Sequence, residues 1–108
     1  MNLEALAIDF GMEEDELLEL VKLFIETSLS DLNRIQSAID EGDAQKVAMA
    51  AHSIKGAAAN LGLTEIFEVA KIIEMEARSN HLDRVQKWIR TLRTEVDRMA
   101  GDLGFGEQ

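Results

Sequence analysis

The absence of proline from all 108 residues is the feature that most constrains the fold of this chain. Proline ends or kinks helices because it lacks an amide donor and its ring clashes with the preceding turn. The sequence is also rich in Leu, Ala, Glu and Ile, a composition that favours long uninterrupted helices. A chain of this length can enclose one modest core, so we expect a single domain over residues 1–108.

Glycine and polar residues mark three short breaks in the apolar pattern. Gly42 is expected to end one helix and Asp43 to cap the next, and Gly62 and Thr64 repeat this device. Asn80 marks the third break. Between the breaks, apolar residues recur at helical spacing, which predicts helices at about 13–41, 44–61, 65–79 and 82–103.

The short connections predict that consecutive helices are antiparallel neighbours. The expected fold is therefore all-α, an up-down four-helix bundle. A short apolar helix at about 3–10 is expected to lie across one end as a lid. A long dimeric coiled coil is the structural alternative, but the glycine breaks argue against it.

Composition excludes several classes of function. Zero cysteines exclude disulfides, thiolate zinc sites and cysteine nucleophiles, and two histidines are too few for a multi-histidine metal site. The formal net charge of −10 predicts repulsion from nucleic acids and anionic membranes. No apolar run approaches the ~18 residues of a membrane span, and the N-terminus is acidic where a signal peptide is basic. We expect a cytoplasmic, monomeric protein.

The charge is unevenly distributed. Residues 44–64 contain no acid, although Lys46 and Lys55 lie within them. Such a window arises by chance, or it marks a surface that must tolerate an anion. On the second interpretation, His52 should have no carboxylate close to it.

His52 is expected on the outer face of its helix. At ~100° per residue, with Ile54 at the centre of the buried stripe, His52 lies about 160° away. Its neighbours on that face are small or apolar rather than charged, which is typical of a surface that docks another protein. The alternative is that alanine is frequent there only because it favours helix. The candidate docking residues are Gln45, Ala48, Met49 and Ala59.

Lys55 and Gly56 complete a candidate phosphoryl-acceptor site. Glycine inside a helix costs about 1 kcal/mol relative to alanine, and at position 56 it makes room beside the imidazole. Lys55 can swing its ammonium toward the same space. A neutral imidazole is nucleophilic near pH 7 and can carry a covalent intermediate. No GxxxxGK[ST] motif or Mg²⁺-binding acid pair lies nearby, which predicts no ATP-binding or autokinase site.

The segment "AHSIKGAAANLG", residues 51–62, resembles the signature of histidine-containing phosphotransfer (HPt) domains, roughly H-x-[LI]-K-G-[SA]-[SA]-x-x-[LI]-G. The matching positions are His52, Ile54, Lys55, Gly56, Ala57, Ala58, Leu61 and Gly62. "LFIETSLSDLNRIQSAIDEGD" and "EVAKIIEMEAR" are similar to the helices that precede and follow the signature in that family. The resemblance covers about residues 10–80.

The resemblance implies a four-helix bundle that relays phosphate in a multistep two-component system. His52 would accept the group on Nε2 from a receiver aspartate, or directly from a histidine or hybrid kinase as in chemotaxis-type systems. It would then pass the group to a response-regulator receiver. Lys55 would stabilise the phosphoryl oxygens and Gly56 would clear space. No cofactor would be bound by this chain, since the Mg²⁺ would come with the receiver.

Two other functional classes stay open. The first is a noncatalytic adaptor bundle that binds receivers through the same patch, although such a protein has no need of His52 with Lys55 and Gly56. The second is a hydrolase or metal enzyme, which the scarcity of His and Cys disfavours. The second histidine, His81, lies at a break without lysine and glycine companions and is expected to be solvated.

Overall fold

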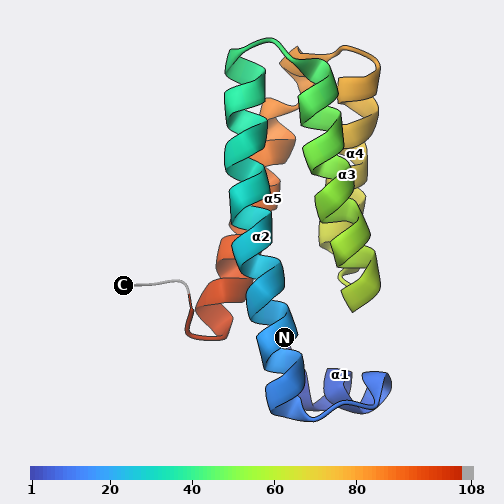
Figure 1. The fold of residues 1–108 in the computed structure, drawn as a ribbon, viewed down its shortest axis with the longest axis vertical. Coiled ribbons are helices and arrows are strands. Elements are labelled where there is room, and N and C mark those ends of the chain that lie inside the picture. Colours follow the sequence, from blue (N-terminus) through green and yellow to red (C-terminus); the bar gives the residue numbers. More distant parts are fainter. Residues whose placement is uncertain (106–108) are drawn as a thin grey trace.

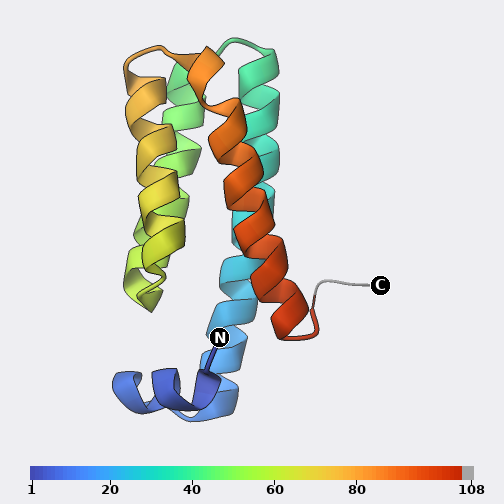
Figure 2. The ribbon, with the colours of Figure 1, turned by 180° about the vertical axis from the view of Figure 1, so that it is seen from behind.

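The computed structural model describes residues 1–105. In this range the helices are α1 (Leu3–Phe10), α2 (Glu14–Asp40), α3 (Ala44–Leu61), α4 (Thr64–Arg78), the 3₁₀ turn η1 (Leu82–Arg84) and α5 (Gln86–Asp102). Helices α2 to α5 run up and down as an antiparallel bundle, with α2 and α3 on one side (Figure 1) and α4 and α5 on the other (Figure 2). The predicted all-α four-helix bundle is confirmed. None of the described helices is long and apolar enough to cross a membrane.

Backbone turns at the predicted breaks end the helices. Gly42 and Gly62 have φ of 71° and 69°, a left-handed conformation that favours glycine. Asp43 caps α3 by accepting a hydrogen bond from the Lys46 amide at 3.1 Å. The prediction that Thr64 caps α4 is wrong. The turn at Gly62 places Leu63 at the cap position, so that Thr64 is already the first helical residue.

The last helix starts later than predicted. Instead of one helix from residue 82, η1 occupies Leu82–Arg84 and α5 begins at Gln86. Asn80, with φ of 62°, reverses the chain after α4. The Arg84 amide then donates to the His81 carbonyl at 3.0 Å, a spacing of three residues that closes a 3₁₀ turn rather than an α-turn.

The core is a single apolar cluster to which every bundle helix contributes one stripe. Helix α3 packs against both α2 and α4, and α5 closes the bundle between α4 and α2. Ile54, the centre of the predicted stripe of α3, is buried. The largest fully buried side chains include Leu17, Leu32 and Ile35 of α2, Val47 and Ile54 of α3, Ile73 of α4, and Leu92 and Val96 of α5.

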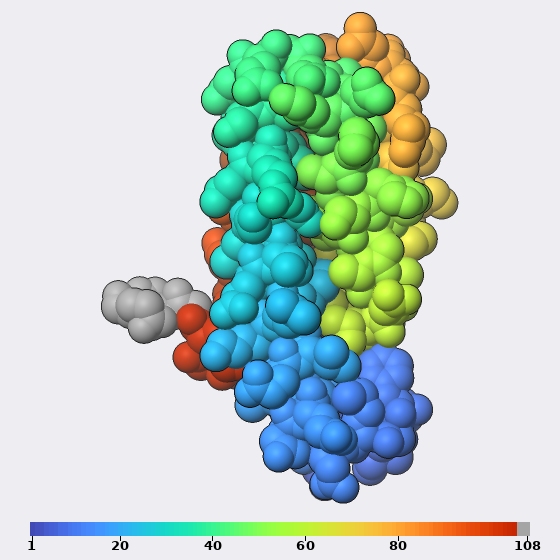
Figure 3. Space-filling view, in the orientation of Figure 1, coloured from blue at the N-terminus to red at the C-terminus, as the bar shows by residue number. Residues whose placement is uncertain are grey.

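Helix α2 is longer than its partners, 27 residues against 18 in α3, and its N-terminal part extends beyond the bundle. Helix α1 packs across this extension, as Figure 3 shows at the foot of the molecule. The turn at Gly11 (φ 66°) brings α1 back against α2, where Ala7 is buried and its carbonyl accepts from the Met12 amide at 2.9 Å. The short N-terminal helix therefore lies across one end of the molecule.

Candidate functional site

His52 lies on the outer face of α3, as predicted, and 62% of its side chain is exposed. Its Nδ1 is 3.0 Å from Oε2 of Glu74 on α4. An ionised carboxylate only accepts hydrogen bonds, which assigns the imidazole proton to Nδ1. The Nε2 lone pair is then available, and among residues 1–105 no group bonds to it. The site therefore presents the Nε2 side of an oriented imidazole to solvent.

Glu74 is a buried carboxylate at the centre of the site, with 5% of the residue exposed. Lys55 Nζ is 2.7 Å from its Oε1. Arg78 donates from Nη2 at 2.7 Å and from Nε at 3.0 Å to Oε2. Burial raises the pKa of Glu74, but hydrogen bonds from Lys55, Arg78 and His52 and the charge of Lys55 outweigh it and lower the pKa to about 2. The carboxylate is therefore ionised throughout the physiological range.

The helical hairpin of α3 and α4 explains why these residues meet. His52 and Glu74 are 22 residues apart, and Leu63, in the turn, stands midway between them. Both arms rise at the same distance per residue, so positions equidistant from the turn lie level with each other. Arg78 follows Glu74 by one helical turn and can therefore reach the same carboxylate.

One expectation about this site is wrong. The acid-free window of α3 does not leave His52 without a carboxylate, because the neighbouring helix supplies Glu74 through space. Lys55 is three-quarters buried and paired with Glu74, which holds its ammonium in the cluster beside His52. Hydrophobic packing of α3 on α4 brings the two faces together, which a pattern within α3 alone cannot indicate.

Gly56 is exposed on the same face as His52. A Cβ placed on it would meet nothing within 4 Å apart from its chain neighbours and the backbone of its own helix. Close packing within the described chain therefore does not require glycine here. The missing side chain leaves open space beside the imidazole, consistent with the predicted vacancy.

The predicted docking residues fall into two groups. Gln45, Met49 and Ala59 are exposed, and Met49 is the most exposed of the large apolar side chains of α3, at 62%. Ala48 is only 2% exposed, so its assignment to the outer face is wrong. Because α3 packs against both α2 and α4, its buried arc is wider than one stripe centred on Ile54.

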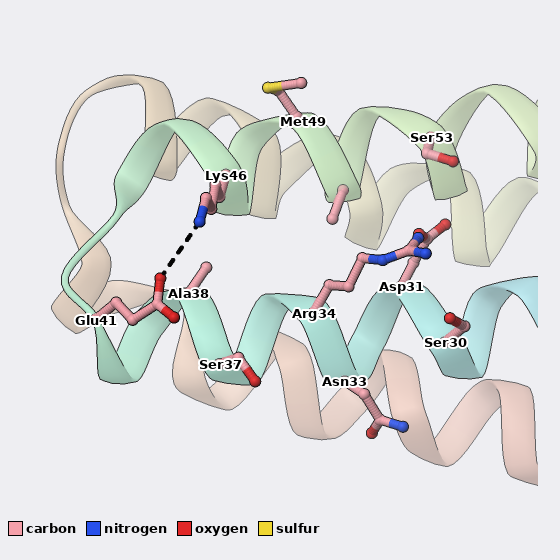
Figure 4. Close-up of a pocket in the computed structure, with 11 residues that line it drawn as sticks. Ser30, Asp31, Asn33, Arg34, Ser37, Ala38, Glu41, Lys46, Met49 and Ser53 are labelled. Atoms are coloured by element: carbon pink, nitrogen blue, oxygen red, sulfur yellow. Dashed lines mark hydrogen bonds and ion pairs between the residues drawn. The ribbon is translucent and has the colours of Figure 1, made fainter.

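A groove of about 680 Å³ separates α2 from α3 beside this face (Figure 4). Met49 and Ser53 of α3 lie along it, and Met49 points away from α2. At one end Lys46 of α3 pairs with Glu41 at 3.6 Å, and further along Arg34 pairs with the buried Asp31 at 2.9 Å. The lining is thus mixed, with both apolar and polar side chains from α3 and mostly polar ones from α2.

His81 is not part of this cluster. It lies in the turn after α4, is partly buried, and its Nδ1 is 3.1 Å from Oε1 of Glu76. The expectation that it is solvated holds in part, since 42% of its side chain is exposed, and it contacts none of the residues around His52.

Sequence reasoning missed Glu74 and Arg78. Glu74 is an acid at a core-facing position of α4, between the buried Ile73 and Ala77, and buried acids are rarely left without partners. Position 74 is also as far from the turn between α3 and α4 as position 52, which places Glu74 level with His52 on the neighbouring helix.

Comparisons with known proteins identify the family and the fold. The family model described as Hpt domain matches residues 19–102, which is more than half of the chain. The crystal structure of histidine-containing phosphotransfer protein B (HptB) from Pseudomonas aeruginosa PAO1 is similar in fold, with a TM-score of 0.66 and 24% sequence identity. The alignment covers 92% of each chain. No curated protein matches the sequence significantly.

Proposed function

This chain belongs to the Hpt domain family, and we propose that it carries the phosphoryl group of a phosphorelay on Nε2 of His52. Membership of the family makes it a histidine phosphotransfer protein whose partners are receiver domains and kinases. One observation carries the choice of atom: Glu74 holds Nδ1, so that Nε2 is the exposed nucleophilic nitrogen.

The proposed step needs no proton transfer at His52. The Nε2 lone pair attacks the phosphorus of a receiver's aspartyl phosphate, a P–N bond forms, and the P–O bond breaks with the carboxylate as leaving group. The ring keeps its Nδ1 proton and becomes positively charged, and the ionised Glu74 stabilises that charge through the 3.0 Å hydrogen bond. Reversal of the step onto a second receiver completes the relay.

Positioning and charge supply the rest of the mechanism. We assign Lys55 to the phosphoryl oxygens, because its ammonium already lies in the cluster around His52. Gly56 leaves space for the incoming group, since a Cβ built on it would have no atom within 4 Å apart from its own helix backbone and its chain neighbours. We place the Mg²⁺ of the reaction on the receiver.

We propose that the receiver docks on the exposed face formed by Gln45, Met49 and Ala59. Met49 lies one helical turn before His52, so a partner that covers it also reaches the imidazole. The groove beside it offers a second contact area along α2. One chain presents every residue of the site, which supports action as a monomer, and we place the carrier in the cytoplasm.

The central test is transfer from a phosphorylated receiver in the presence of Mg²⁺, followed by analysis of the label. We expect acid-labile, base-stable phosphate on the wild type and on His81→Gln, and none on His52→Gln. Circular dichroism should show the same helix content in all three proteins. Label that persists on His52→Gln would contradict the site assignment.

Docking can be separated from chemistry with phosphoramidate, a small donor that needs no docking surface. Its P–N bond breaks and ammonia leaves as the new bond to Nε2 forms. Met49→Ser should slow transfer from the receiver and leave labelling by phosphoramidate unchanged. Met75→Ser, which alters a methionine of similar exposure on α4, is the matched control and should change neither.

A further inference from the structure

Arg78 has no role in the step described above, yet it makes two hydrogen bonds within the site. Both its Nε and its Nη2 donate to Oε2 of Glu74, at 3.0 and 2.7 Å. Lys55 contacts the other oxygen, Oε1, at 2.7 Å. One buried carboxylate therefore has two cations, each on its own oxygen.

The charges of the cluster suit the arrival of a phosphoryl group. Lys55 and Arg78 carry one positive charge each and Glu74 carries one negative charge. The nucleophilic form of the His52 imidazole, with a free lone pair on Nε2, carries none. The resting site thus has a net charge of +1. The transferred group, PO₃⁻, adds one negative charge and makes the site neutral. Without Arg78, the same transfer would leave a net charge of −1.

We propose that Arg78 is a positioning residue that keeps Glu74 compensated, so that Lys55 can turn from Glu74 to the phosphoryl group on His52. This inference rests on the proposed function. When Lys55 leaves, Oε1 loses its donor, but Oε2 keeps its hydrogen bonds from Arg78 and from Nδ1 of His52.

Arg78 and Lys55 differ in how firmly each is held, as expected if Arg78 stays on Glu74 and Lys55 moves. Arg78 is held by a two-donor fork to a residue one turn earlier on its own helix, a geometry with little freedom. Lys55 makes one contact through a flexible chain that starts on α3, three residues after His52. The lysine is therefore the mobile cation and the arginine the fixed one.

Removal of Arg78 should tie Lys55 to Glu74. A buried carboxylate left without a cation is strongly disfavoured, so in Arg78→Gln the lysine has to stay where it is. The phosphoryl group on His52 would then have no cation from this chain. The equilibrium with the receiver should shift toward the aspartyl phosphate, by about fivefold for a partly exposed arginine.

The experiment measures the fraction of phosphoryl group on His52 at equilibrium with a phosphorylated receiver. We expect Arg78→Gln to lower the equilibrium constant for transfer from the receiver to His52 about fivefold. Arg78→Lys should lower it less. Arg98→Gln removes an equally exposed arginine from a pair with Glu95 on α5 and should leave it unchanged. The half-life of the phosphohistidine made with phosphoramidate should be shortest in Arg78→Gln, intermediate in Arg78→Lys and unchanged in Arg98→Gln. Urea unfolding checks that each variant is folded.

A double-mutant cycle with Lys55→Gln distinguishes this role from a structural one. If Arg78 acts by releasing Lys55, then Arg78→Gln should have less than a twofold effect once Lys55 is gone. If the effects of Arg78→Gln and Lys55→Gln on the equilibrium constant simply multiply in the double variant, the inference is overturned. An Arg78→Gln variant with the same equilibrium constant as Arg98→Gln would also overturn it. A wild-type protein that takes no label would instead overturn the proposed function, so the two failures are distinguishable.

Discussion

The two histidines of this protein share one motif and differ in everything around it. Each has its Nδ1 close to a glutamate of α4, His52 at 3.0 Å from Glu74 and His81 at 3.1 Å from Glu76. Glu74 is buried between two cations, whereas the side chain of Glu76 is 27% exposed and has Arg84 at 3.7 Å. The surroundings of the pair, rather than the pair itself, therefore distinguish the proposed acceptor His52 from His81.

The backbone sharpens the contrast. The His81 amide donates to the Glu76 carbonyl at 2.8 Å, so that this pair braces the turn after α4. His52 stands within a regular helix and has the open flank of Gly56 beside it. His52 thus has three features that His81 lacks, and we propose that transfer uses them: a buried carboxylate, a cation surplus and the open flank of Gly56.

Closing the open flank should have the largest effect. Gly56→Leu places a bulky side chain beside the imidazole, and we expect transfer from a receiver to fall by at least a thousandfold. Gly101→Leu, at an exposed glycine near the end of α5, should transfer phosphate at the wild-type rate. Radiolabel transfer and circular dichroism check both proteins. Normal transfer by a folded Gly56→Leu variant would show that the space is not used.

The second largest effect should come from neutralising the glutamate of the His52–Glu74 pair, compared with that of the His81–Glu76 pair. Glu74→Gln removes the charge that balances the phosphorylated ring, and we expect transfer to slow about a hundredfold. Glu76→Gln should slow it less than twofold. Rapid-quench measurement of the transfer rate compares them, and equal rates for both variants would contradict the role of Glu74.

The stability of the fold should depend on pH through Glu74. Its pKa is about 2 in the folded protein against 4.5 for an unperturbed glutamate, so folding favours the ionised form. The resulting stabilisation is complete above about pH 5 and is lost as the pH falls toward 2. Between pH 7 and pH 3, urea unfolding should show the wild type losing about 2 kcal/mol relative to Glu74→Gln. A constant difference between the two proteins would rule out this linkage.

The smallest of these effects should come from the mobile cation. Lys55→Gln should slow transfer about tenfold while changing the dissociation constant of the receiver less than twofold. Lys71→Gln, at an exposed lysine on α4, is the control for the loss of one positive charge. Stopped-flow transfer and calorimetric binding measure the two quantities. Equal losses in rate and affinity would mean that Lys55 serves docking rather than transfer.

Features encoded within one helix could be predicted from the sequence. The glycine turns, the stripe centred on Ile54, and the common face of His52 and Gly56 all follow from periodicity and local backbone preference. The 3₁₀ turn at η1 did not follow, because the apolar spacing of this segment fits a continuous helix, whereas the Arg84 amide bonds to the carbonyl three residues earlier.

Features that arise where helices meet could not be predicted in the same way. Ala48 is buried because α3 has two neighbours, and Glu74 reaches His52 from α4. The absence of acids from α3 describes the composition of one helix, whereas the electrostatic environment of the imidazole depends on both arms of the hairpin. Arg78 is a further step removed, since it acts on His52 only through Glu74.

The turn at Gly62 gives the site a strict dependence on chain length. Inserting one residue between positions 53 and 61, or between 65 and 73, would rotate one partner by about 100° and shift it by about 1.5 Å along its helix. The carboxylate would then leave the imidazole while both helices stayed intact. Natural variants of this protein that keep the buried glutamate should therefore tolerate substitutions in this segment far better than insertions or deletions, and lengthening should be confined to the loops beyond α2 and α4.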